Sequence, residues 1–211
     1  MTQVEAMKAL VALHVAAFTT RDAAALLNVT PANASMILRR LERHGFLLHL
    51  ARGRWAVAKA VSRFELPELL TAPEPAYVSL QSALFHHGLI EQVPAVIYAV
   101  TPGRTRRIDT PLGTVSFHRI PPELFTGFEV DAGGGAKIAT AEKALFDTLY
   151  LAPARSRLFA RLPEIEFPRS FDWPQLQRYV RDVKSESRRT YLTERISALR
   201  GSRRDRRTAR G

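Results

Sequence analysis

The 211-residue chain contains no cysteine. This absence excludes a disulfide framework and a zinc site built from thiolates, and it fits a reducing cytoplasm. The chain also lacks an apolar run long enough to cross a bilayer, and its first eighteen residues lack the basic n-region of a signal peptide. No strongly basic amphipathic helix of the interfacial type stands out. We therefore expect a cytoplasmic protein without a membrane partner.

Acidic residues are scarce relative to basic ones: 20 Asp and Glu stand against 31 Lys and Arg, giving a net charge of +11. The excess is placed at the two ends. Residues 1–60 carry eight basic and three acidic side chains, residues 184–211 carry ten and three, and the segment between them is close to neutral. Two positive regions flanking a neutral body favour contact with a polyanion.

Helix signals are dense between residues 18 and 58. Thr19 or Thr20 can cap a short helix, Thr30 can cap a second one, and Gly45 is suited to end it. Residues 3–17 precede them as a further expected helix. Apolar residues of the second helix recur at i, i+3, i+4 and i+7, namely Ala34, Ile37, Leu38 and Leu41. One face of this helix is therefore expected to be buried.

The opposite face of that helix has small residues near its start and arginines behind them, which suits a DNA major groove. A hairpin of residues 46–50 and 55–58 follows, with two arginines at its tip. The order predicts a winged helix-turn-helix with residues 30–44 as recognition helix. The alternative is a small helical domain with a solvated basic face. The residues predicted to contact DNA are Thr30, Ala32, Asn33, Ser35, Met36, Arg39, Arg40, Arg43, Arg52, Gly53 and Arg54.

Prolines between residues 59 and 76 interrupt any regular pattern, so this segment is predicted to be a linker or a wrapped connection. Strand patterns at 96–101 and 105–108, which we expect to pair, and a helix over 138–151 predict a mixed α/β domain over residues 77–200. Residues 201–211 have little to bury and are expected to be disordered. The predicted fold class is α+β, with a winged helix-turn-helix domain over residues 1–58.

Five runs in the second domain resemble the C-terminal domain of AbiEi-type antitoxins, which are named for phage abortive infection. They are Tyr77–Leu84 (YVSLQSAL), His87–Leu89 (HGL), Arg104–Gly113 (RTRRIDTPLG), Phe117–Ile120 (FHRI) and Ile138–Tyr150 (IATAEKALFDTLY). They keep the family's order, and with the winged module the resemblance covers most of residues 5–200. Ala141 stands where the family has proline.

The resemblance implies a transcriptional autorepressor that binds the operator of its own operon. Such a protein is the antitoxin of a type IV toxin–antitoxin system, encoded beside a nucleotidyltransferase-like toxin that it need not contact. Copies could associate on DNA. Two alternatives stay open: a general winged-helix regulator whose second domain senses a ligand, and an antitoxin that binds its toxin directly.

No catalytic, metal or cofactor site is predicted. His86, His87 and His118 lack a nearby carboxylate at ligand spacing. The glycine-rich segment 131–137 lacks the spacing of a phosphate-binding loop, and Lys143 with Asp147 fits a local i, i+4 brace. We expect no enzyme. Three clustered arginines, Arg104, Arg106 and Arg107, form either a solvated hairpin edge or a second surface for nucleic acid or a partner.

Overall fold

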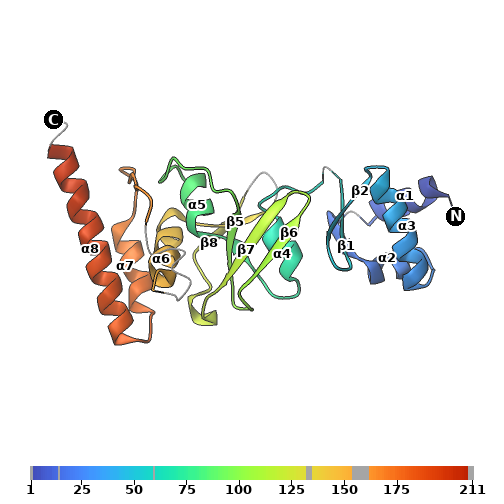
Figure 1. Cartoon of the computed structure of the whole chain (residues 1–211). Coiled ribbons are helices and arrows are strands. Elements are labelled where there is room, and N and C mark those ends of the chain that lie inside the picture. The colour runs from blue at the N-terminus through green and yellow to red at the C-terminus, as the bar shows by residue number, and fades with distance from the viewer. Residues whose placement is uncertain (1, 14, 59, 132–134, 154–161, 209–211) are drawn as a thin grey trace.

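The computed structural model describes residues 2–13, 15–58, 60–131, 135–153 and 162–208, with the backbone alone for residues 202–208. The chain is a mixed α+β structure with two separate β-sheets, as predicted. Figure 1 shows an elongated arrangement, in which the N-terminal helices lie at one end and helix α8 at the other. The larger sheet lies between them.

Three helices and a three-stranded antiparallel sheet make up the N-terminal part. The helices are α1 (Gln3–Val11), α2 (Thr20–Leu26) and α3 (Pro31–Arg43), and the sheet has the order β1 (Ala17–Thr19), β3 (Arg54–Val57) and β2 (Leu47–Ala51). The first helix is shorter than predicted, because residues 17–19 pair with β3. Leu10, Leu38, Leu41, Leu47 and Trp55 belong to the core of this part.

The second sheet has six strands in the order β6-β7-β5-β4-β9-β8. Its strands are β4 (Tyr77–Val78), β5 (Ile97–Thr101), β6 (Arg106–Thr110), β7 (Gly113–Arg119), β8 (Phe128–Val130) and β9 (Lys137–Ala139). The predicted pairing of β5 with β6 is wrong. Instead, β6 pairs antiparallel with β7 across a two-residue loop that ends at Gly113 (φ +127°), and β5 lies parallel to β7. A tight hairpin closes a shorter loop than the predicted pairing.

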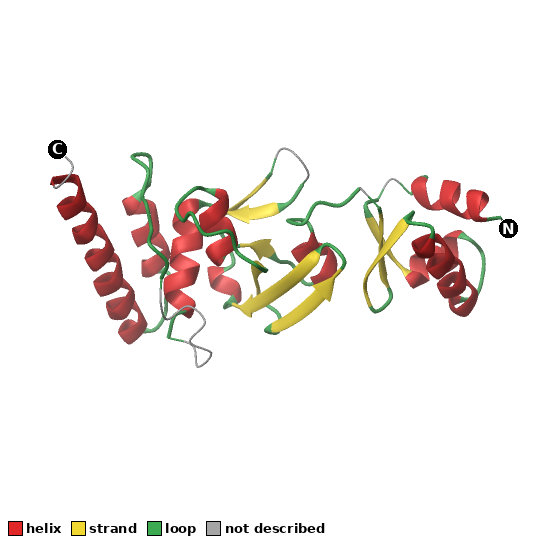
Figure 2. Ribbon diagram, turned by 45° about the horizontal axis from the view of Figure 1, so that its top comes forward, coloured by secondary structure: helices red, strands yellow, loops and turns green. Residues whose placement is uncertain are grey.

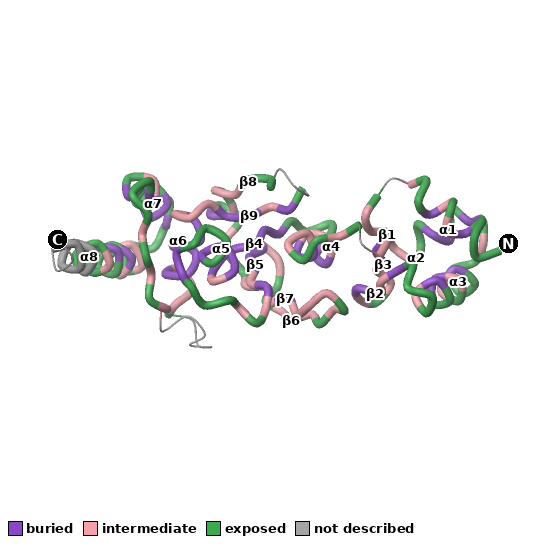
Figure 3. The backbone as a smooth tube through the Cα atoms, turned by 90° about the horizontal axis from the view of Figure 1, so that it is seen from above, coloured by how far each residue is buried: buried purple, intermediate pink, exposed green. Residues whose placement is uncertain are grey.

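Helices cover one end of this sheet. They are α5 (Leu80–His86), α6 (Ala141–Leu151), α7 (Trp173–Arg181) and α8 (Glu186–Thr208), and a 3₁₀ turn spans Pro122–Leu124. Contacts link α5 to α6, α6 to α7, and both of these to α8. Figure 2 shows the helices grouped at this end, and Figure 3 shows buried segments in α5, α6 and the central strands. The helix expected over 138–151 begins later, at Ala141, because Lys137–Ala139 form β9 and Thr140 caps α6.

Of the two possibilities predicted for residues 59–76, residues 60–76 form the wrapped connection and not a free linker. It contains helix α4 (Leu66–Thr71), whose Leu66 and Leu70 are buried in the core of the second part. Pro67 is accommodated because it lies in the first turn, where its missing N–H would have had no helical partner. The connection thus joins the two parts through buried contacts.

The prediction that residues 201–211 are disordered is wrong for residues 201–208, where α8 continues through Thr208. Arginine is a good helix former, and each residue added to an existing helix gains a backbone hydrogen bond. Residues 209–211 lie outside the described residues. Within the described parts of the chain, no helix combines the length and the apolar composition that crossing a membrane would require.

Candidate nucleic-acid interface

Helix α3 has the caps that the sequence predicted. The Thr30 hydroxyl accepts a hydrogen bond from the Asn33 backbone N–H at 3.3 Å, and Pro31 occupies the first turn. Gly45, with φ +75°, ends the segment in the left-handed conformation. The helix therefore begins where the Thr30 side chain satisfies a free backbone N–H. It ends just before a glycine that adopts the left-handed conformation.

One face of α3 is buried and the other is exposed. Ala34, Leu38 and Leu41 have no solvent exposure. Ser35 is half-buried at the margin between the two faces. The exposed side chains on the predicted contact face are Ala32, Asn33, Met36, Arg39, Arg40 and Arg43. The predicted division of this helix into a core face and an outward basic face is confirmed.

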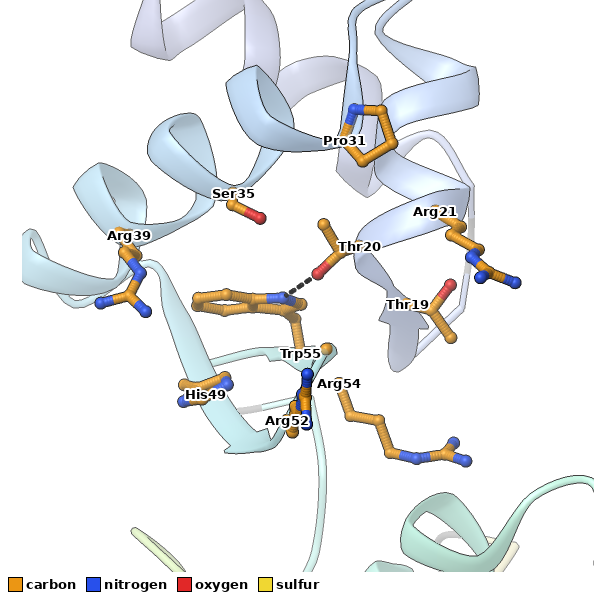
Figure 4. Close-up of a pocket in the computed structure, with 11 residues that line it drawn as sticks. Thr19, Thr20, Arg21, Pro31, Ser35, Arg39, His49, Arg52, Arg54 and Trp55 are labelled. Atoms are coloured by element: carbon orange, nitrogen blue, oxygen red, sulfur yellow. Dashed lines mark hydrogen bonds between the residues drawn. The ribbon is translucent and has the colours of Figure 1, made fainter.

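A groove of about 860 Å³ separates α3 from the hairpin β2–β3 and the start of α2. Ser35 and Arg39 border it from α3, and Arg52 and Gly53 border it from the hairpin tip. Figure 4 shows Arg39 and Arg52 on two different elements around this opening. The structure thus brings together predicted residues that are distant in sequence. Ala32, Asn33, Met36, Arg40 and Arg43 lie on α3 outside the groove lining.

The floor of the groove contains side chains that sequence reasoning missed. The Trp55 indole N–H donates to the Thr20 hydroxyl at 2.9 Å, and the His49 ring packs on the indole with centroids 4.5 Å apart. Trp55 is 3% exposed. The indole thus ties the start of α2 to β3 within the lining of the groove. Arg21 of α2 also borders the groove and is a further cation that the α3-centred pattern did not indicate.

Arg54 does not present its charge to DNA in the predicted way. Its guanidinium donates to the backbone carbonyl of Leu69 at 3.0 Å and to that of Ala72, both at the C-terminal end of α4. Figure 4 shows the side chain running away from α3. The turn explains the difference, because Gly53 with φ +70° interrupts the strand alternation that would otherwise place residues 52 and 54 on one face. Arg54 borders the groove but directs its charge to the second part of the chain.

The arginine cluster of the second sheet is also divided. Arg104 and Arg107 are exposed, and Arg107 lies 3.8 Å from Asp109. Arg106 is half-buried with its guanidinium over the Phe117 ring, 5.4 Å from the centroid. The three do not form one exposed surface, because successive residues of β6 point to opposite faces of the sheet.

The three histidines do not form one metal-binding group, although the His86 and His87 rings pack edge to face with centroids 5.1 Å apart. The His87 ring lies 2.7 Å from the Ala139 carbonyl, His86 packs against Phe64, and His118 lies 3.0 Å from the Ser116 hydroxyl. In the described ranges, no three His, Asp or Glu residues come close enough to hold a metal ion. The lysine of the glycine-rich segment, Lys137, pairs with Glu68 of α4.

Burial lowers the pKa of His118 from 6.5 to about 4. The unfolded chain therefore binds a proton at His118 more tightly than the folded protein does, so protonation favours unfolding. The stability that His118 contributes is fully present above the unfolded pKa and is lost as the pH falls toward 4. We expect the free energy of unfolding to drop by about 2 kcal/mol more in the wild type than in His118→Gln between about pH 7 and about pH 4, after allowing for partial exposure. Urea unfolding at both pH values measures this. Equal drops in the two proteins would contradict it.

The interior of the second part holds a closed polar network. Lys143 Nζ lies 2.6 Å from Asp147 Oδ1, and the Tyr77 and Ser79 hydroxyls donate to Asp147 Oδ2 at 3.0 and 2.7 Å. Both charged side chains have no solvent exposure. Burial raises the pKa of Asp147, and Lys143 acts in the opposite direction. Burial, followed by the nearby Asp147 charge, raises the pKa of Tyr77 well above its usual value. The predicted Lys143–Asp147 pairing is confirmed, at a depth that the sequence did not indicate.

No family model and no curated protein matches this chain.

Proposed function

We propose that the N-terminal part is a winged helix-turn-helix that binds double-stranded DNA, with α3 as recognition helix and β2–β3 as wing. The groove that Arg39 of α3 and Arg52 of the hairpin both border is the observation that carries the proposal. Cations from two separate elements around an opening fit a phosphate backbone, while the small, exposed start of α3 suits close approach to base edges. The positive charge of residues 1–60 favours the same ligand.

We further propose that the protein represses its own operon as the antitoxin of a type IV, AbiE-like system. This part rests on the resemblance of residues 77–150 to AbiEi-type antitoxins. Repression would follow from occupancy of the operator. The toxin partner would be nucleotidyltransferase-like.

Replacing Arg39 with alanine should weaken operator binding by ~1–3 kcal/mol if its contact to a base is bidentate. Arg40→Ala should have a smaller effect, because Arg40 lies outside the groove lining. Fluorescence anisotropy titrations with the DNA upstream of the chain's own gene measure both variants. Arg181→Ala, an exposed arginine on α7, is the matched control and should bind like wild type. Wild-type affinity in both α3 variants would remove this helix from the interface.

The antitoxin role is tested separately by co-expression with a nucleotidyltransferase-like toxin encoded beside this gene. The expected result is restored growth together with repression of a reporter fused to the upstream DNA. Repression without restored growth would favour the general regulator. Restored growth accompanied by a stable complex would favour direct toxin contact.

A further inference from the structure

The hairpin β2–β3 belongs to two hydrophobic cores at once. Leu47 and Trp55 pack in the N-terminal core. Leu50 and Ala56, 1% and 0% exposed, pack instead in the core of the second part, together with α4. A bulge between His49 and Ala51 turns the additional residue, Leu50, toward that second core. The hairpin that borders the proposed DNA groove is therefore also buried against the rest of the protein.

Hydrogen bonds hold the hairpin tip from both sides. The Gly53 carbonyl accepts the Thr20 backbone N–H at 3.0 Å, on the groove side. On the other side, the Arg54 guanidinium donates to Leu69 and Ala72. Helix carbonyls at a C-terminus lack intrahelical partners, so a cationic fork satisfies them well. Gly53 has φ +70°, a conformation that favours glycine and lets its two neighbouring arginines diverge.

The two sheets meet at the same place. Strand β2 is an edge of the small sheet and β6 an edge of the large one, and the two strands are in contact without a shared ladder of hydrogen bonds. Figure 1 shows the small sheet facing α4 and β6. Arg52 points into the groove from a hairpin whose opposite face rests on α4 and β6, so the position of Arg52 relative to Arg39 depends on the second part.

We propose that Arg54 is an inter-domain positioning residue: by holding the hairpin tip to the end of α4, it fixes the DNA groove and links DNA affinity to the state of the second domain. This inference rests on the proposed DNA-binding function. It assigns Arg54 a role different from that of Arg52, although the two arginines flank the same glycine. Linkage is reciprocal, so DNA binding also strengthens the contact between the hairpin and α4.

The test compares lysine and methionine at both positions in the full-length chain. Lysine keeps the charge but cannot form the planar two-carbonyl fork. Arg54→Lys and Arg54→Met should therefore both lose about tenfold in operator affinity, the factor that corresponds to ~1.4 kcal/mol. Neither should change the slope of log affinity against log salt, because no phosphate contact is lost. Arg52→Lys should bind nearly as wild type, and Arg52→Met should have a slope shallower by about 0.9.

Amide hydrogen exchange without DNA provides the independent readout. Faster exchange of residues 47–57 in both Arg54 variants, with the exchange of α6 unchanged, supports the positioning role. This result does not depend on DNA binding. If the protein binds no DNA, only the proposed function is overturned. Wild-type exchange in both Arg54 variants would overturn the inference. A shallower salt slope in Arg54→Met with wild-type affinity in Arg54→Lys would also overturn it, because that pattern marks a direct phosphate contact.

Discussion

Asp147→Asn should lower the free energy of unfolding by about 3–5 kcal/mol, the usual cost of leaving one member of a buried ion pair without its partner. The amide oxygen can still accept hydrogen bonds from the Tyr77 and Ser79 hydroxyls that now bind the carboxylate. What the substitution removes is the negative charge. Lys143, with no solvent exposure, then keeps three aromatic rings as neighbours but no counter-ion.

The double variant Lys143→Met with Asp147→Asn should recover most of this loss, because no uncompensated charge stays in the core and methionine fills a similar volume. Urea unfolding of the wild type, the two single variants and the double variant measures the coupling free energy. If the double variant is more stable than Asp147→Asn, the loss in the single variant comes from the unpaired charge of Lys143. The difference between the double variant and the wild type then gives the net contribution of the pair.

A surface pair provides the matched control. Lys184 lies 2.8 Å from Glu123, with side chains 82% and 41% exposed. Glu123→Gln should leave the free energy of unfolding almost unchanged, because water solvates the freed ammonium. If Asp147→Asn lowers the free energy of unfolding no more than Glu123→Gln does, the buried pair does not stabilise the second part in the way proposed.

Deleting residues 201–211 should make the salt dependence of DNA binding shallower by up to about 4 in the slope of log affinity against log salt. The segment has five arginines and one aspartate, and each phosphate neutralised contributes about 0.9 to the slope through release of condensed counterions. Specific and non-specific DNA should be weakened alike, because phosphate contacts carry no sequence information. Thermal stability should hardly change, since the deleted residues include no large apolar side chain.

Affinity titrations at several salt concentrations, with operator and unrelated DNA, measure this for the full-length and truncated proteins. A variant with the five arginines changed to glutamine keeps the length of the segment and isolates its charge. Parallel salt lines and equal affinities for all three proteins would show that the segment has no part in binding.

Local features of the chain were predictable from sequence. The Thr30 cap, the Gly45 end and the buried stripe of α3 all depend on residues within a few positions of one another. The same holds for the Thr140 cap and the pairing of Lys143 with Asp147 one helical turn later. Short-range hydrogen bonding and helical spacing determine such features, so a single sequence contains the information that they require.

Contacts between segments distant in sequence determined the features that local patterns did not predict. Residues 17–19 form a strand because β3 provides their backbone partners, and residues 66–71 form a buried helix because the second core covers them. Arg52 and Arg54 look equivalent in the sequence, and both border the groove, yet only Arg54 binds the end of α4. The burial of Lys143 likewise depends on three aromatic rings from three elements, β4, α6 and α7. Burial and the choice of partner follow from long-range packing, which local pattern and charge do not determine.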